Sequence, residues 1–244
     1  GNILRNTAST LRHPHQILRL FEIGRCFTPQ PNQLPAEKDF LVATVAGPRG
    51  DSIWDHGSGG LDFFDMKGIL ESIMANVRIA HEIIEMDDPF LHPGRSASIH
   101  VGGTQVGIIG EIHPEVIQRF DIPLQQIVFL ELDLQAFSAG ASATTYNFAP
   151  FSRYPIADRD LALVVDISVS AGRLQEILES HPLVKRAVLF DWFSGDELPQ
   201  GKKSLAFRLE LQSETETLGT QTINSAVNDL LEDLKQRTGA VLRD

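Results

Sequence analysis

Residues 201–211 constrain the fold more than any other stretch of this 244-residue sequence, because apolar and polar side chains alternate along it. Strands place successive side chains on opposite faces, so the alternation predicts a strand with one face on a core and one face open. The expected inward face is Leu205, Phe207, Leu209 and Leu211. The expected outward face is Ser204, Ala206, Arg208 and Glu210.

A second strand is predicted just before the first, over residues 188–193. The polar, glycine-bounded segment 195–201 joins the two strands as a hairpin with a longer loop. Alternation again assigns the side chains to two faces. Val188, Phe190 and Trp192 are expected inward, and Leu189, Asp191 and Phe193 outward.

The elements around this hairpin follow a definite order. Residues 160–166 alternate like a strand, whereas residues 172–180 and 223–234 carry apolar side chains at helical spacing. Residues 240–242 complete the pattern as a short last strand. The resulting β-α-β-β-α-β order is the ferredoxin-like plan, in which both helices cover one face of the sheet and the other face stays open.

The open face offers Asp191, Phe193, Ser204 and Arg208 to a ligand. An aromatic ring beside polar groups and a guanidinium suits an unstacked nucleotide base, because RNA is usually recognised through splayed single-stranded bases. A solvated sheet face with one exposed aromatic residue has the same pattern. The alternation by itself leaves both interpretations open.

The first half of the chain reads as an α+β domain built on an antiparallel sheet. Residues 1–17 have no clear pattern, and Asp65 is expected to cap a helix that buries apolar residues at positions 69–77. Residues 135–150 are small and polar, as in a linker between domains. Strands are expected at 20–27, 40–46, 97–101, 105–109 and 127–134, with a short helix at 114–120.

Composition limits the class of protein. The net charge of −11 argues against extended phosphate binding, so any RNA contact must be local or must rely on a partner for the phosphates. The single cysteine, Cys26, excludes an internal disulfide, fits a reducing cytoplasm and is expected to be buried. The sequence has no run of 18 apolar residues and no signal-peptide core, so no membrane segment is expected.

Two groups of residues invite a catalytic or metal-binding interpretation. His92, Arg95, Glu111, His113 and Glu115 lie close in sequence, but no nucleophile motif frames them and no third ligand stands at metal spacing. The pair in His13-Pro14-His15 also lacks a further ligand. We therefore expect no metal site. A stand-alone hydrolase at the first group, and a ferredoxin-like small-molecule regulatory module without RNA binding, are the alternatives.

Several motifs resemble the beta subunit of phenylalanyl-tRNA synthetase, and the resemblance covers nearly the whole chain. In the second half they are FSRYP at 151–155, RDLALVV at 159–165, LFD at 189–191 and PQGKKSLAF at 199–207. In the first half they are LFEIGR at 20–25, DFFDMKG at 62–68, LHPGRSA at 91–97 and IGEIHPE at 109–115.

The resemblance implies a domain division. Residues 1–134 would be a class II synthetase-like, catalytically silent domain, truncated at its N-terminus, and residues 151–244 a ferredoxin-fold anticodon-binding domain. In the family the alpha subunit carries out aminoacylation with ATP and magnesium, and the beta module packs on it in a cytoplasmic heterotetramer. The residues that the resemblance assigns to structure or to the subunit interface are Arg25, Asp65, Lys67, His92, Arg95, Glu111 and His113.

For the second domain the resemblance implies recognition of the anticodon of the phenylalanine tRNA. Asp191 would accept hydrogen bonds from the first anticodon base, a guanine, and Phe193 would be the stacking aromatic, where the family commonly has tyrosine. Ser204 and Ala206 match the neighbouring strand positions. Ser194 replaces a frequent arginine, which weakens the expected phosphate contact.

Overall fold

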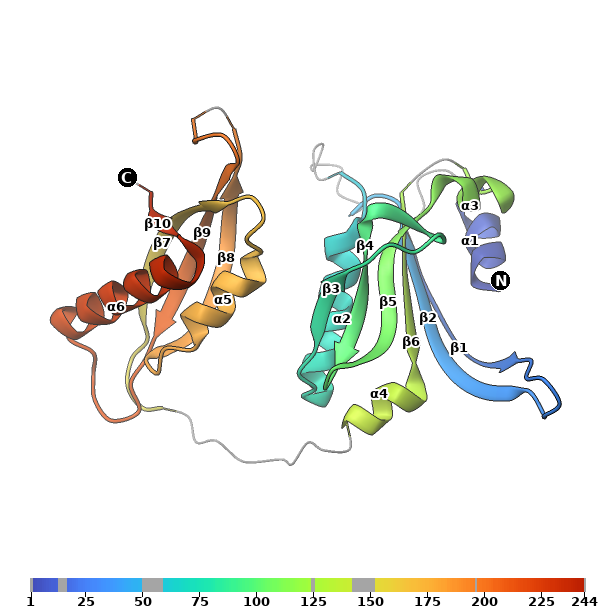
Figure 1. Cartoon of the computed structure of the whole chain (residues 1–244), viewed down its shortest axis with the longest axis horizontal. Helices are drawn as coiled ribbons and strands as arrows, with labels where there is room; N and C mark the ends of the chain where they lie inside the picture. The colour runs from blue at the N-terminus through green and yellow to red at the C-terminus, as the bar shows by residue number, and fades with distance from the viewer. Residues whose placement is uncertain are drawn as a thin grey trace. The chain divides into compact units, whose positions relative to one another are not determined.

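The computed structural model describes residues 2–12, 17–49, 59–123, 126–141, 152–195 and 197–243. The chain divides into two compact units, Gly1–Tyr146 and Asn147–Asp244 (Figure 1). Among the helices of the described ranges, none combines the length and the apolar character that a membrane-spanning helix needs.

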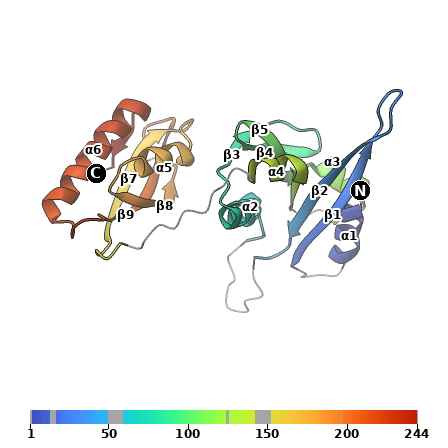
Figure 2. The same ribbon diagram turned by 90° about the horizontal axis from the view of Figure 1, so that it is seen from below.

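The first unit is built on a six-stranded antiparallel sheet with the strand order β1-β2-β6-β5-β4-β3 (Figure 1), and Figure 2 shows the unit from below. The strands are β1 (Leu18–Thr28), β2 (Ala36–Ala46), β3 (Glu82–Glu85), β4 (Leu91–Val101), β5 (Thr104–Ile112) and β6 (Ile127–Asp133). The helices are α1 (Asn2–Leu11), α2 (Phe63–Val77), α3 (Pro114–Arg119) and α4 (Leu134–Ala141). The sheet and the short helix predicted near residue 114 are thus present.

Helices pack on both faces of this sheet, and strand β6 lies at its centre. Val128, Leu130 and Leu132 belong to the core that includes α2, whereas Ile127 and Phe129 belong to the core that includes α1 and α3. A strand covered on both sides has no polar face, because each side meets a core. This explains why residues 127–132 read as a nearly continuous apolar run.

The N-terminal segment and Cys26 differ from the sequence expectations. Residues 2–11, which have no clear pattern, form α1 with its buried side chains at helical spacing, namely Ile3, Leu4, Thr7, Ala8 and Leu11. Cys26 is exposed, not buried, because it lies on the outer part of β1, the edge strand of the sheet.

Helix α2 begins earlier than expected. Asp62, not Asp65, is the N-cap residue, and Asp65 completes a capping box from the third helical position. The buried face of the helix consists of Met66, Leu70 and Met74. The predicted buried residues Ile69 and Val77 are each 39% exposed.

The stretch predicted as a linker is partly helical, since its residues 135–141 belong to α4. Asp133 starts this helix by accepting hydrogen bonds from the backbone N–H groups of Gln135 and Ala136. Residues 142–150 lie outside the described part of the chain.

The second unit has the predicted β-α-β-β-α-β order. Its elements are β7 (Ala157–Asp166), α5 (Ala171–Glu179), β8 (Val184–Phe193), β9 (Lys202–Leu211), α6 (Thr220–Thr238) and β10 (Val241–Leu242). The sheet order is β10-β7-β9-β8 with antiparallel neighbours. Figure 1 shows α5 and α6 on the same side of this sheet, which is the ferredoxin-like arrangement.

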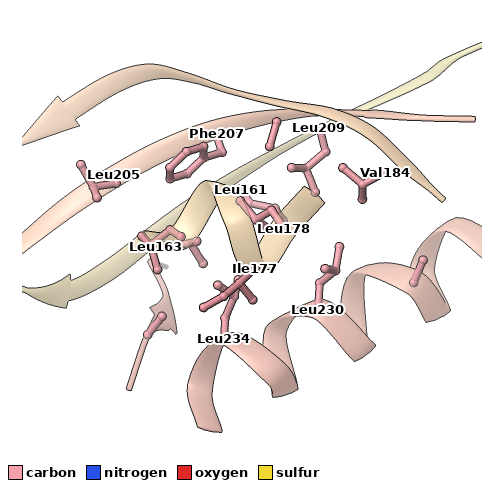
Figure 3. Packing of buried hydrophobic residues seen from close by; sticks show 14 of the residues in the cluster. Leu161, Leu163, Ile177, Leu178, Val184, Leu205, Phe207, Leu209, Leu230 and Leu234 are labelled. Carbon is pink, nitrogen blue, oxygen red and sulfur yellow. The ribbon is translucent and has the colours of Figure 1, made fainter. Parts of the chain in front are cut away.

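The core of the second unit lies between the sheet and its two helices. Figure 3 shows Leu161 and Phe207 from the sheet facing Ile177 from α5 and Leu234 from α6. Phe207, Ile177 and Leu234 have no exposed surface. The inward face predicted for β9 is confirmed, because Leu205, Phe207, Leu209 and Leu211 all belong to this core.

Candidate functional site

The pairing of β8 with β9 brings the candidate residues of the open face together. Asp191 lies opposite Ala206, and Phe193 lies opposite Ser204. Cross-strand neighbours in an antiparallel sheet share a face, and the residues between Ser204, Ala206 and Arg208 on β9 point into the helix-covered core. The five candidate site residues, Asp191, Phe193, Ser204, Ala206 and Arg208, therefore lie on the face away from the helices.

The predicted inward face of β8 is wrong for Val188 and Phe190 and right for Trp192, because an irregularity interrupts the strand. The register shifts between Leu189 and Asp191, which leaves Phe190 as an extra residue of a β-bulge. Before the bulge, Val188 pairs with Arg208 on the open face and Leu189 pairs with Phe207 on the helix side. This is the reverse of the expected assignment.

Phe190 and Trp192, both expected to be buried, are 51% and 66% exposed. Trp192 pairs with Leu205 of the helix side, but β8 is an edge strand and the ring remains largely accessible. Phe190 lies with Arg208, whose guanidinium carbon is 5.2 Å from the centre of its ring. The bulge thus adds an aromatic ring to the open face.

Asp191 presents an available carboxylate on this face. Its side chain is exposed, and among the described residues no group donates a hydrogen bond to it or forms an ion pair with it. A carboxylate accepts through two oxygens and binds a pair of parallel donors well. The position next to two aromatic residues, Phe190 and Phe193, suits a planar ligand that carries such donors.

Phe193 is more enclosed than expected. The guanidinium carbon of Arg243 lies 5.2 Å from the centre of its ring. Gly195 also approaches the ring so closely that a Cβ atom at this position would lie 2.9 Å from Cζ of Phe193. Ser204, opposite Phe193, is only 4% exposed. Ser204 therefore forms part of the floor of the open face, and its hydroxyl group is hardly accessible to a ligand.

Arg208 is held in a fixed orientation. Its Nε and Nη2 atoms donate to the two carboxylate oxygens of Asp160, each at 2.8 Å. These hydrogen bonds hold the pKa of Asp160 below its usual range. Asp160 lies opposite Arg208 on β7, so the pairing of β7 with β9 brings it into the site.

Sequence reasoning missed Phe190 and Arg243 as neighbours of the site. The alternation of β8 assigns Phe190 to the wrong face, and nothing in the local sequence signals a bulge there. Arg243 follows the last strand, where its N–H group donates to Ala162 O at 2.8 Å. Its contact with Phe193 joins residues from opposite ends of the strand order β10-β7-β9-β8 and has no sequence signature.

In the first unit the residues assigned to structure or to an interface take part in separate contacts. Arg25 donates to Glu37 at 2.9 Å and to Asp39 at 2.8 Å, and its bond to Asp39 lowers the pKa of that carboxyl group. Arg49 binds Asp65 at 2.9 Å, which lowers the pKa of Asp65. Lys67 pairs with Glu71 one helical turn further along α2.

Glu111 is the most buried of these residues, with a side chain 10% exposed. It accepts from Arg95 Nη1 at 2.7 Å and from Gln126 Nε2 at 2.6 Å. All three residues line a cavity of about 630 Å³. His92 and His113 do not line it, and His113 instead caps α3 by accepting from the N–H group of Glu115 at 3.2 Å.

In the described ranges, no three His, Cys, Asp or Glu side chains form a group that could hold a metal ion. The pair His13 and His15 lies outside the described residues.

Two family models match this chain, one for each unit. The model of the phenylalanyl tRNA synthetase beta chain CLM domain matches residues 1–134. The model of the ferredoxin-fold anticodon binding domain matches residues 152–243. Together they cover the elements described above except α4, of which only Leu134 lies within a matched range.

Curated relatives match over the same length. The phenylalanine–tRNA ligase beta subunit of Dehalococcoides mccartyi (strain ATCC BAA-2266 / KCTC 15142 / 195) is 36% identical over 236 residues, which are 97% of this chain and 29% of the relative. The beta subunit of Dechloromonas aromatica (strain RCB) is 35% identical over 252 residues, 100% of this chain and 31% of the relative. That of Bacillus subtilis (strain 168) is 32% identical over 248 residues, 99% of this chain and 30% of the relative. The chain thus spans less than one third of each relative.

Proposed function

Because the chain belongs to the phenylalanyl-tRNA synthetase beta chain family, we propose that it is a non-catalytic segment of a phenylalanine–tRNA ligase. In this proposal it packs on the alpha subunit and binds the anticodon of the phenylalanine tRNA during ATP-dependent aminoacylation in the cytoplasm. The full enzyme is an alpha2-beta2 heterotetramer, and its ATP and magnesium are bound by the alpha subunit.

The observation that carries the proposal is the accessible carboxylate of Asp191 on the open face of the second sheet. Guanine presents two parallel donors, its N1–H and N2–H groups, to such a carboxylate, whereas adenine and the pyrimidines lack this donor pair. Asp191 therefore selects guanine as the first anticodon base. Phe193 and the paired Arg208 provide flat surfaces for stacking.

The acidic character of the chain fits this mode of binding. A net charge of −11 makes broad attraction of the phosphate backbone unfavourable, so recognition depends on contacts with bases. The phosphates are contacted by other parts of the enzyme. Ser204 and Ala206 form the floor beneath the bases, since Ser204 is buried and Ala206 half-buried.

The surface of β1 supports the assignment of the first unit to subunit packing. Phe21, Ile23 and Phe27 alternate along this edge strand and are 73%, 59% and 60% exposed. Exposed apolar patches of this kind mark protein–protein contacts. Arg25 and its partners Glu37 and Asp39 lie beside them and supply polar groups at the rim.

Replacement of Asp191 by alanine tests the proposed function. In the full-length beta subunit reconstituted with its alpha subunit, we expect Asp191→Ala to lower kcat/KM for the phenylalanine tRNA by about 10- to 100-fold, since a hydrogen bond to a charged group contributes roughly 1.5–3 kcal/mol. The measurement is steady-state aminoacylation with varied tRNA.

Two controls sharpen this experiment. Asp229→Ala removes the same charge from the exposed side of α6 and should leave kcat/KM within twofold of the parent. A tRNA with adenine in place of the first anticodon guanine should be a poor substrate for the parent. Its kcat/KM should fall little further with the Asp191→Ala enzyme. An unchanged kcat/KM for Asp191→Ala would contradict the assignment and favour a small-molecule regulatory module.

A further inference from the structure

The bulge in β8 leaves an accessible aromatic ring on the open face. The alternating pattern of the sequence does not predict this ring there, and it is not among the candidate residues of the site. Phe190 is 51% exposed, and it directly precedes Asp191. Phe193, in contrast, is half-buried beside Arg243 and Gly195. Of these two open-face rings, Phe190 thus offers the larger free surface to a ligand.

The guanidinium group of Arg208 lies over the ring of Phe190 and is oriented so that a base could stack on it. Its guanidinium carbon is 5.2 Å from the centre of the ring, within the range of a cation–π contact. The bidentate pair with Asp160 fixes the guanidinium plane and balances its charge. A guanidinium neutralised in this way is a weak phosphate ligand, but its flat surface remains available to a base.

We propose that Phe190 and Arg208 form a second base-stacking platform, which holds an unpaired base other than the guanine bound by Asp191. The inference rests on the proposed function of the open face. Phe190 and Phe193 are three residues apart on one strand, which corresponds to about 10 Å or less. Bases stacked on one another are only about 3.4 Å apart, so the two platforms hold bases that are splayed, as in single-stranded RNA recognition.

If this platform exists, replacing Phe190 should weaken tRNA binding, and the loss of affinity should depend on a single base of the anticodon loop. In the reconstituted full enzyme we expect Phe190→Leu to raise the Kd for the phenylalanine tRNA about tenfold, because base–aromatic stacking makes a contribution of this order. Phe190→Tyr keeps the aromatic ring, and its Kd should stay within twofold of that of the parent. Trp192→Leu removes an exposed aromatic residue from the helix side of the same strand and should have no effect.

A set of tRNAs, each with one abasic nucleotide in the anticodon loop, identifies the stacked base by filter binding. The loss caused by Phe190→Leu should vanish for one abasic position that is not the first anticodon base, and persist for the others. A loss of equal size with every tRNA, or no loss at all, would overturn the inference. Thermal unfolding of each variant shows whether a change in Kd reflects a change in folding.

Salt dependence separates stacking from phosphate binding. Arg208→Gln, which removes the charge, should weaken binding without changing the slope of log Kd against log salt concentration, whereas loss of a phosphate contact would reduce that slope by about 0.7. If Asp191→Ala weakens binding and Phe190→Leu does not, only the second platform fails. If neither variant has an effect, the proposed function itself fails.

Discussion

Among single residues, Glu131 illustrates how strand position determines the cost of a charge. It lies in the central strand β6, between Val42 of β2 and Ile108 of β5. Burial, followed by the nearby negative charge of Asp88, raises the pKa of its carboxyl group. The folded protein therefore holds a proton at Glu131 more tightly than the unfolded chain does, and ionisation of this residue at neutral pH opposes folding.

Glu131→Gln should stabilise the first unit in a pH-dependent manner. Below the unfolded pKa of about 4.3 the carboxyl is protonated in both states, and the variant should gain little. As the pH rises through the higher folded pKa, the parent loses stability and the neutral amide does not. The difference in urea midpoint should grow from pH 4 to pH 7.5. A constant difference would mean that the pKa of Glu131 is the same in both states.

Residue-scale prediction from sequence succeeds where a side chain's role depends on local pattern. Leu205 and Phe207 are buried as expected, because the alternation of β9 is uninterrupted. It fails at Phe190, because the strand contains a bulge that the local sequence does not signal. Asp191 and Phe193 keep their expected face only because they follow the bulge, where the pairing with Ala206 and Ser204 is regular again.

At the scale of secondary structure elements, the start of α2 depends on a network around Asp62. Its carboxylate accepts from the N–H group of Phe64 at 2.8 Å and from Arg49 Nη2 at 3.0 Å. The carboxylate of Asp65 in turn accepts a hydrogen bond from the N–H group of Asp62 at 2.8 Å. Because α2 supplies Met66, Leu70 and Met74 to one core of the sheet, this cap stabilises a helix on which that core depends.

Asp62→Ala should destabilise the first unit by about 1 kcal/mol, the usual contribution of an N-cap side chain. Asp62→Asn keeps an acceptor at the cap and should lose only part of this amount. The free energy of unfolding from urea titration provides the measurement. Equal stability of the alanine variant and the parent would show that Asp65 and solvent satisfy the first turn of α2 without this side chain.

At the scale of the whole molecule, each unit has a core drawn from its own residues. The buried cluster of the second unit contains only residues between Leu161 and Ala240. The two clusters of the first unit end at Leu132 and Phe129. A unit that buries its own apolar side chains in this way has the anatomy of an independently folding domain.

Residues 152–244 should therefore fold when produced alone and unfold in one cooperative transition. Leu163 has no exposed surface, so Leu163→Ala should lower the stability of the isolated unit by roughly 2–5 kcal/mol. The same substitution in the whole chain should shift the same transition equally. A second unit that lacks near-ultraviolet circular dichroism when isolated would show that its packing depends on the rest of the chain.

The sequence alone determined the order of elements in the second unit and the family of the chain. Period-two and helical spacing are local properties, and residues 205–211 and 223–234 show them without interruption. The motifs that carry the resemblance likewise occupy short continuous segments. The open face and its residues Asp191 and Phe193 followed from these local patterns.

The tertiary structure decided which neighbours these residues meet. The bulge at Phe190 and the exposure of Trp192 depend on pairing between β8 and β9 at an edge of the sheet. The Arg208–Asp160 pair and the contact of Arg243 with Phe193 join residues from different strands. The physical reason is that register and edge position are properties of paired strands, whereas alternation is a property of one strand.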